Sequence, residues 1–230
     1  ASSAGAATQE ACLAIAEQLY KVAHKIPDTP FAKVKFDDVQ FEDGAMVLTG
    51  EPAKRLKISK IMQLGQKDSI KEEGNTAPSM IKQLPYARNT HSAVFVEVEV
   101  DEDHGMVHVS RVVAAIAAGR ILNPKTARSQ ILGGVVWGIS MALHEESVVD
   151  HKLGRIMNHN FSEYHIPVNR DIENIEVIFV EEEDKVVSPI GVKGLGEIGI
   201  VGTAAAVANA IFHATGKRVR DLPITLDKLL

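Results

Sequence analysis

A regular alternation of apolar and charged residues constrains the fold of this 230-residue chain more than any other feature. Between residues 92 and 101 the even-numbered positions are mostly valines, and the odd ones end in Glu97, Glu99 and Asp101. A period of two is typical of a strand with one buried face. Residues 101–105 predict a turn and residues 106–116 a second strand. The sequence therefore predicts an antiparallel hairpin here.

Helices and further strands are predicted around the hairpin. Apolar residues at helical spacing predict a helix over 5–25. The pair Asn123-Pro124, a favoured cap before a favoured first residue, predicts a helix over 124–145. A third helix is expected from about 198 to 215, closed by Gly216. The shorter predicted elements are strands at 34–40, 45–48, 146–149 and 175–181, the last buried on both faces, a helix at 56–66, and a surface loop at 66–79.

This order of elements predicts an α+β fold, with mixed or antiparallel sheets and helices packed on one face. Strands separated by long helices leave right-handed crossovers as an alternative topology. We expect two lobes, residues 1–85 and residues 86–230, which meet near residues 80–92.

Composition excludes several classes of protein. The chain is 45% hydrophobic, enough for a substantial core, and its net charge of −5 comes from 25 basic and 30 acidic residues spread along the sequence. Without a basic stripe, nucleic acid is not an expected partner, and no apolar run of about 18 residues predicts a membrane span. The single cysteine, Cys12, excludes an internal disulfide and a four-thiolate cluster, and the nine histidines lack the spacing of metal ligands. Cysteine usage favours the cytoplasm and leaves the periplasm open.

The glycine-rich stretch 191–199 holds one carboxylate, Glu197, and we expect the chemistry there. Glycines at 194, 196 and 199 allow positive φ angles and the close approach of a planar ligand, so Gly194 and Gly196 are candidate cofactor-contacting residues. The spacing also matches a dinucleotide-binding fingerprint, although no strand directly precedes it and Glu197 would face the phosphates. An ordinary glycine turn that caps a helix is the third interpretation.

Gln130, Gly134 and Gly138 fall on one stripe of the helix predicted over 124–145. Two interpretations are open. In one, the stripe packs tightly against a sheet and Gln130 makes a routine buried hydrogen bond. In the other, Gln130 offers its amide to a ligand that lies over the glycines.

Ser2 and Ser3 precede the first predicted helix and are natural N-caps. A capped N-terminus can bind a phosphate, and it can equally be an ordinary cap.

Several motifs, taken together and in order along the chain, resemble one family. They are Val98-Glu99-Val100-Asp101, Gln130 in Ser-Gln-Ile-Leu-Gly-Gly, Tyr-His-Ile-Pro at 164–167, Glu197 in Gly-Val-Lys-Gly-Leu-Gly-Glu-Ile-Gly, and Arg-Val-Arg-Asp-Leu-Pro at 218–223. The chain resembles the C-terminal part of the molybdenum-binding subunit of the xanthine dehydrogenase and aldehyde oxidase family, over nearly its whole length.

The resemblance implies a molybdopterin cofactor whose metal takes its ligands from the cofactor, and none from the protein. It implies that Glu197 is the general base, which deprotonates a metal-held hydroxide that attacks an aldehyde or N-heterocycle while hydride passes to a sulfido ligand. Gln130 matches a residue that hydrogen-bonds the molybdenum ligands, and Ser2 and Ser3 match the edge of a serine-rich loop that holds the pterin. Partners implied are the rest of the molybdenum subunit, an iron–sulfur subunit and an FAD subunit.

The family's substrate-orienting residues and first pterin-binding segments precede the part that this chain matches. We therefore expect the chain alone to lack turnover, and substrate identity stays open. A noncatalytic nucleotide- or anion-binding domain that uses the 191–199 loop, and a purely structural module, are the competing hypotheses.

Overall fold

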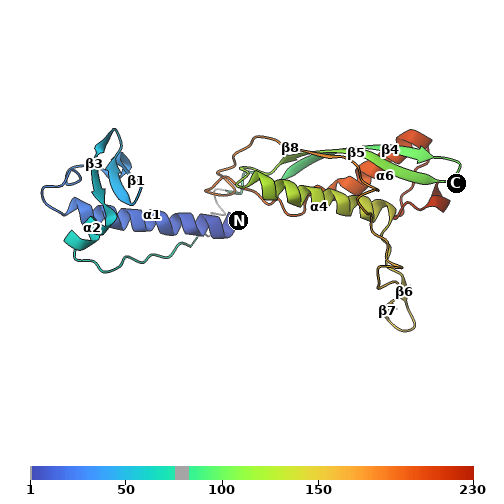
Figure 1. Ribbon diagram of the computed structural model, residues 1–230, viewed down its shortest axis with the longest axis horizontal. Coiled ribbons are helices and arrows are strands. Elements are labelled where there is room, and N and C mark those ends of the chain that lie inside the picture. Colours follow the sequence, from blue (N-terminus) through green and yellow to red (C-terminus); the bar gives the residue numbers. More distant parts are fainter. Residues whose placement is uncertain (1, 76–82) are drawn as a thin grey trace. The chain divides into compact units, whose positions relative to one another are not determined.

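The structure, a computed structural model, describes residues 2–75 and 83–230. The chain forms two compact units, residues 1–81 and residues 82–230 (Figure 1). The boundary predicted from the sequence was residue 85, and the last residues of the predicted surface loop, 76–79, lie outside the described residues.

The first unit packs two helices on a small antiparallel sheet. Its elements are α1 (Ser2–His24), the 3-10 helix η1 (Phe36–Asp38), β1 (Val39–Glu42), β2 (Ala45–Leu48), β3 (Glu51–Lys57) and α2 (Ile58–Leu64). The strand order is β1-β2-β3. Leu19 and Ala23 of α1 meet Phe31, Met46 of β2 and Ile61 of α2 in a core. Burial of these apolar side chains provides the main stabilisation of the unit.

Three predictions for this unit need correction. Ser2 and Ser3 do not precede the first helix as caps, because both already lie in its first turn. Residues 36–38 form a 3-10 turn instead of the start of a strand. Strand β3 was missed because six of its seven residues are exposed, so it has no buried alternation, and Pro52 suits an edge strand.

The second unit is a three-stranded mixed sheet with helices on one face (Figure 1). Strand β4 (His91–Asp101) pairs antiparallel with β5 (Met106–Ala117), which pairs parallel with β8 (Ile175–Phe179). The core lies between the alternate residues of β4 and β5, such as Val96 and Val112, and the helices, through residues such as Val135 and Val207. The predicted α+β fold is confirmed.

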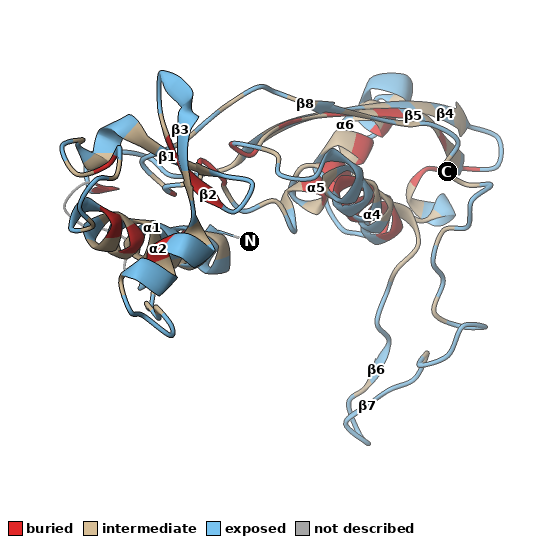
Figure 2. Cartoon of the chain, turned by 60° about the vertical axis from the view of Figure 1, so that its left-hand side comes forward, coloured by how far each residue is buried: buried red, intermediate tan, exposed pale blue. Residues whose placement is uncertain are grey.

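The helices of this unit are α4 (Pro124–Leu143), α5 (Ile198–Val201) and α6 (Thr203–Thr215), followed by the 3-10 helix η2 (Leu226–Lys228). Strands β6 (Val149–Asp150) and β7 (Arg155–Ile156) form a minimal hairpin on an exposed arm that follows α4 (Figure 2).

The predicted hairpin is confirmed, with Asp101 paired to Met106 across the turn and a bulge at Glu97/Val98. The strand predicted at 146–149 is reduced to Val149 and Asp150. The strand predicted at 175–181 ends at Phe179, and its residues alternate between half-buried and exposed. The prediction that both faces are buried is wrong, because Glu176 and Ile178, which share one face of β8, are exposed.

The start of α4 and the end of α6 follow the sequence signals. The Asn123 side chain accepts hydrogen bonds from the backbone N–H groups of Lys125 and Thr126 at 3.1 and 3.2 Å, which is a regular N-cap. Gly216 closes α6 with a φ of +73°, a left-handed conformation that glycine adopts without strain. The helix predicted over 198–215 is divided at Gly202 into α5 and α6.

The expectation that no apolar run reaches the length of a membrane span is wrong for one segment. Residues Ile198–Thr215 form an 18-residue window with a mean hydropathy of 1.5, which passes by length and composition alone. The buried residues of α6, among them Val207 and Ile211, join the core together with residues of α4 and β4. The segment therefore supplies one side of the protein core.

The contact between α4 and α6 leaves no room for a side chain at residue 138. A Cβ atom at Gly138 would lie 2.5 Å from Cβ of the buried Thr203. We predict that Gly138→Ala lowers the free energy of unfolding by about 1 to 3 kcal/mol, the usual cost of overpacking.

Gly133→Ala is the matched control, because a Cβ atom there meets nothing within 4 Å. It should raise the free energy of unfolding by about 0.5 to 1 kcal/mol through helix propensity. Urea unfolding can be followed by the fluorescence of Trp137, the single tryptophan of the chain, which lies in α4. Equal midpoints for the two variants would contradict the close contact.

Candidate functional site

The glycine-rich loop 191–197 runs along the end of strand β5. Val192 forms an isolated antiparallel bridge with Gly119, and the Lys193 N–H donates to the Ala118 carbonyl at 3.0 Å. A Cβ atom at Gly119 would lie 2.5 Å from the Gly191 carbonyl oxygen, so the two segments approach closely because residue 119 is glycine. The start of the loop is thus attached to the sheet.

The middle of the loop is open. Gly194 and Gly196 have no atoms within 4 Å of a notional Cβ, and neither adopts the positive φ that we expected. The positive φ in this stretch belongs to Gly191, at +77°. Gly199 serves packing, since its notional Cβ would lie 2.9 Å from the Ile131 carbonyl oxygen.

Glu197 stands at the end of this loop, directly before α5, and its side chain is exposed. It makes no capping hydrogen bond to the helix, and no ion pair involves it within residues 2–75 and 83–230. The helix has four residues instead of the expected eighteen, so its dipole contributes less than that of a long helix.

Gln130 lies beside Glu197 in space although 67 residues separate them in sequence. Its Nε2 donates a hydrogen bond of 2.9 Å to the carbonyl oxygen of Gly196, the residue before Glu197. The glycine stripe next to Gln130 is covered by protein, since Gly134 contacts Gly199 and Gly138 contacts Thr203. The interpretation of a ligand over the stripe is therefore wrong. The packing partner is α5 and α6, not the predicted sheet.

An ion-pair cluster that the sequence analysis missed holds the same loop. The Lys193 Nζ lies 2.5 Å from Glu182 Oε1 and 3.1 Å from Asp184 Oδ2, and the lysine side chain is 6% exposed. These hydrogen bonds raise the pKa of Lys193. The signal available in the sequence was a lysine inside a glycine loop together with the acidic run 181–184.

The same contacts hold the pKa of both carboxyl groups below the usual range. For Glu182 the largest cause is the Lys193 ammonium, followed by the Gly119 N–H. For Asp184 it is the backbone N–H of Val187, supported by Lys193. Both acids stay ionised well into the acid range.

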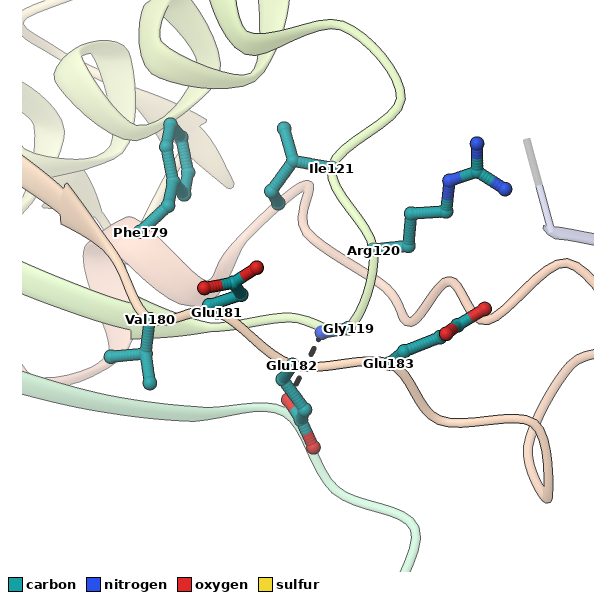
Figure 3. A pocket seen from close by; sticks show the side chains of 8 residues that line it. All are labelled: Gly119, Arg120, Ile121, Phe179, Val180, Glu181, Glu182 and Glu183. Atoms are coloured by element: carbon teal, nitrogen blue, oxygen red, sulfur yellow. Dashed lines mark hydrogen bonds between the residues drawn. The ribbon is translucent and has the colours of Figure 1, made fainter.

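A shallow depression of about 550 Å³ lies where β5 and β8 end (Figure 3). Phe179, Val180 and Ile121 form its apolar part, and Glu181, Glu182, Glu183 and Arg120 its polar part. Figure 3 shows Glu182 turned to the Gly119 N–H, at 3.0 Å. Neither Glu197 nor Gln130 lines this depression, so it is separate from the open end of the loop.

Two other motifs that carried the family resemblance make structural contacts. The Tyr164 hydroxyl donates to Glu145 at 2.8 Å, which raises the pKa of Tyr164. Arg218 donates to Asn209 at 2.7 Å and lies over the Phe212 ring.

Ser2 and Ser3 lie in the first unit, exposed in the first turn of α1. Of the predicted site residues, the structure brings together Gln130, Gly194, Gly196 and Glu197. The dinucleotide fingerprint lacks its usual context, because β8 ends at Phe179, twelve residues before the loop begins at Gly191. The described residues contain no cluster of three or more metal-binding side chains.

Comparison with known proteins identifies the family to which the chain belongs. The sequence model of one protein family, the molybdopterin cofactor-binding domain, matches residues 1–173. The chain therefore belongs to the molybdopterin cofactor-binding domain family.

Two relatives are named as subunits of an aldehyde oxidoreductase and of a dehydrogenase complex. The chain is 52% identical over 145 residues to the aldehyde oxidoreductase molybdenum-binding subunit PaoC of Escherichia coli (strain K12), a match that covers 63% of the chain and 20% of the relative. It is 28% identical over 232 residues to the 6-hydroxypseudooxynicotine dehydrogenase complex subunit gamma of Paenarthrobacter nicotinovorans, covering 98% of the chain and 28% of the relative. The chain thus spans about a quarter of their length.

The fold also matches a solved structure over nearly the whole chain. The Cu,Mo-CO dehydrogenase superposes with a TM-score of 0.78 at 20% identity, over 98% of this chain and 28% of that one. At this identity the likeness establishes the fold.

The ion-pair cluster predicts how the stability of the second unit depends on pH. Because the folded pKa values of Glu182 and Asp184 lie below the unfolded values of about 4, their stabilisation is complete above pH 4 and disappears as the pH falls through the folded values. The variant Glu182→Gln with Asp184→Asn should lose about 1 to 3 kcal/mol at pH 7, between the values for exposed and buried ion pairs.

Below the folded pKa values the chain and its double variant should converge in stability. The measurement is urea unfolding between pH 3 and 7, followed by Trp137 fluorescence. A constant difference between them across this range would contradict the assignment.

Proposed function

We propose that this chain is the C-terminal part of a molybdenum hydroxylase subunit that oxidises an aldehyde or an N-heterocycle, with Glu197 as the general base. One observation carries the proposal. Glu197 is an exposed carboxylate without an ionic partner among the described residues, at the end of a loop whose neighbouring carbonyl is held by Gln130. A carboxylate in this position is available to a ligand, because it makes no ion pair that stabilises the fold.

The loop has the properties that a bulky, planar cofactor requires. The absence of neighbours around Gly194 and Gly196 leaves the backbone open to close approach. Gln130 uses its Nε2 for the loop, and its Oε1 has no hydrogen-bond partner within the described residues, so this acceptor is available to a ligand. No protein side chains would be needed as metal ligands, because the family resemblance implies that the metal takes its ligands from the cofactor. When bound, the cofactor supplies the two-electron oxidising centre.

The role of Glu197 follows from its chemistry. A general base must be ionised, must lie within hydrogen-bond reach of the proton that it accepts, and must be held in place. In the proposed reaction Glu197 takes a proton from the oxygen that attacks the substrate carbon. Gln130 keeps the Gly196 peptide in place, which sets the direction of the backbone as it enters residue 197.

The substrate class and partners are also proposals. The 52% identity to a subunit of an aldehyde oxidoreductase favours an aldehyde. The chain covers less than a third of its relatives, so we propose that the remainder of the same subunit completes the cofactor site. Two-electron oxidation also requires an outlet for electrons, and we propose partner subunits that carry iron–sulfur clusters and FAD.

Replacement of Glu197 tests the proposal in the complete molybdenum enzyme. Glu197→Gln keeps the size of the side chain but cannot accept the proton, so kcat should fall about 10² to 10⁴-fold. The molybdenum content per subunit should stay at the level of the unmodified enzyme, because the substitution leaves the anchors of the loop intact.

Glu102→Gln is the control, since Glu102 is an exposed acid in the turn between β4 and β5. It should leave kcat unchanged. A Glu197→Gln enzyme that retains most of its kcat would disprove the assignment of the base.

A further inference from the structure

Among the described residues, the Lys193 side chain is more deeply buried than the side chains of the other ion pairs. Its side chain is 6% exposed, whereas every ion pair without Lys193 among the described residues joins side chains that are at least 37% exposed. Burial of an ammonium group costs free energy unless its partners are well placed. The position of Lys193 therefore requires a structural or functional reason.

The partners of Lys193 belong to different segments. Glu182 also accepts the Gly119 N–H at 3.0 Å through its other oxygen, at the end of β5. Asp184 accepts the N–H groups of Val186 and Val187 at 3.0 Å through its other oxygen. The ammonium also lies 3.5 Å from the Asn89 carbonyl, before β4. Lys193 thus connects the loop to two segments, residues 182–184 and Asn89, and Glu182 extends the contact to the end of β5.

Leu195 packs against the core, and the two glycines on either side of it depend on polar anchors. Gly194 and Gly196 have no neighbours around a notional Cβ. Their carbonyl groups are held by the Thr90 hydroxyl at 2.7 Å and by Gln130 Nε2 at 2.9 Å. Each of these carbonyl groups accepts one hydrogen bond, and both bonds are exposed to solvent. Lys193 is the charged, buried anchor, four residues before Glu197.

We propose that Lys193 is a positioning residue for Glu197: its contacts with Glu182 and Asp184 fix the loop on the end of β5 and so keep the carboxylate at the entrance of α5. The inference rests on the proposed role of Glu197 as the base. It assigns a function to a residue that touches neither cofactor nor substrate.

The test compares Lys193→Met with Lys185→Met in the complete molybdenum enzyme. Methionine keeps most of the length of the side chain and removes the charge. Lys185 is the matched control, since it pairs with the same acidic run, at 3.5 Å from Glu183, but is 72% exposed. Kinetic constants, molybdenum content and hydrogen exchange of peptides from the 191–200 region are measured for each variant.

Lys193→Met should lower kcat by about tenfold to a hundredfold, the effect expected of a displaced catalytic group, with KM and molybdenum content near the unmodified values. Amide exchange should become faster in residues 191–200 and stay unchanged in the β4–β5 hairpin. Lys185→Met should alter none of these quantities. Unchanged kcat, unchanged exchange in the loop, or loss of molybdenum in Lys193→Met would each overturn the inference.

A second variant covers the case in which Lys193→Met does not fold. Lys193→Met combined with Glu182→Gln and Asp184→Asn leaves no buried charge unpaired, so it should fold and still show low kcat and fast exchange in the loop. Normal kcat and slow exchange in this variant would overturn the inference.

The two proposals fail in different ways. If Glu197→Gln retains its kcat, the role of the base is wrong, while exchange still reports whether Lys193 holds the loop. If Glu197→Gln loses activity and Lys193→Met does not, only the role of Lys193 is wrong.

Discussion

The second unit depends on the close contact between helix α4 and the segment that begins at Gly199. A notional Cβ at Gly134 lies 3.0 Å from Gly199, and one at Gly199 lies 2.9 Å from the Ile131 carbonyl, so both positions need the absence of a side chain. This approach sets the distance between the two helical segments. It also explains why Gln130, one turn before Gly134, reaches the carbonyl of Gly196. Helix packing therefore contributes to the geometry on the α5 side of Glu197.

Two kinds of force hold the loop in this unit, and they act at opposite ends. Apolar packing around Gly199 and Thr203 fixes the end that continues into α5 and α6. Charge and backbone hydrogen bonds fix the other end, through Lys193 and the bridge between Val192 and Gly119. Between these ends Leu195 packs against the core, while Gly194 and Gly196 have open surroundings. A loop held in this way can present the backbone of its glycines to a ligand without losing its own conformation.

The parts of the fold that could be predicted from the sequence are those set by local signals. The valine alternation of β4, the Asn123 cap and the left-handed Gly216 each depend on neighbours within a few residues. Strand β3 and the break at Gly202 carry no such signal, because an exposed edge strand has no alternation and Gly202 interrupts an otherwise apolar run. In the loop, Glu197 and Gln130 could be found as residues. Their hydrogen-bonded proximity could not, and the φ values expected for Gly194 and Gly196 were wrong because space, and not turn geometry, is what those glycines provide.

The Lys193 cluster shows why such an anchor is both invisible in sequence and useful in structure. Its partners are 11 and 9 residues away, and the Asn89 carbonyl is 104 away, so no periodic pattern connects them. An apolar side chain at 193 could fill the same space at lower desolvation cost. Its contacts would be non-directional, however, so they would not favour particular partners. An ammonium group has three donors, and here its three acceptors come from two segments, residues 182–184 and Asn89. Contacts with several acceptors favour one position of the loop, at the cost of desolvation.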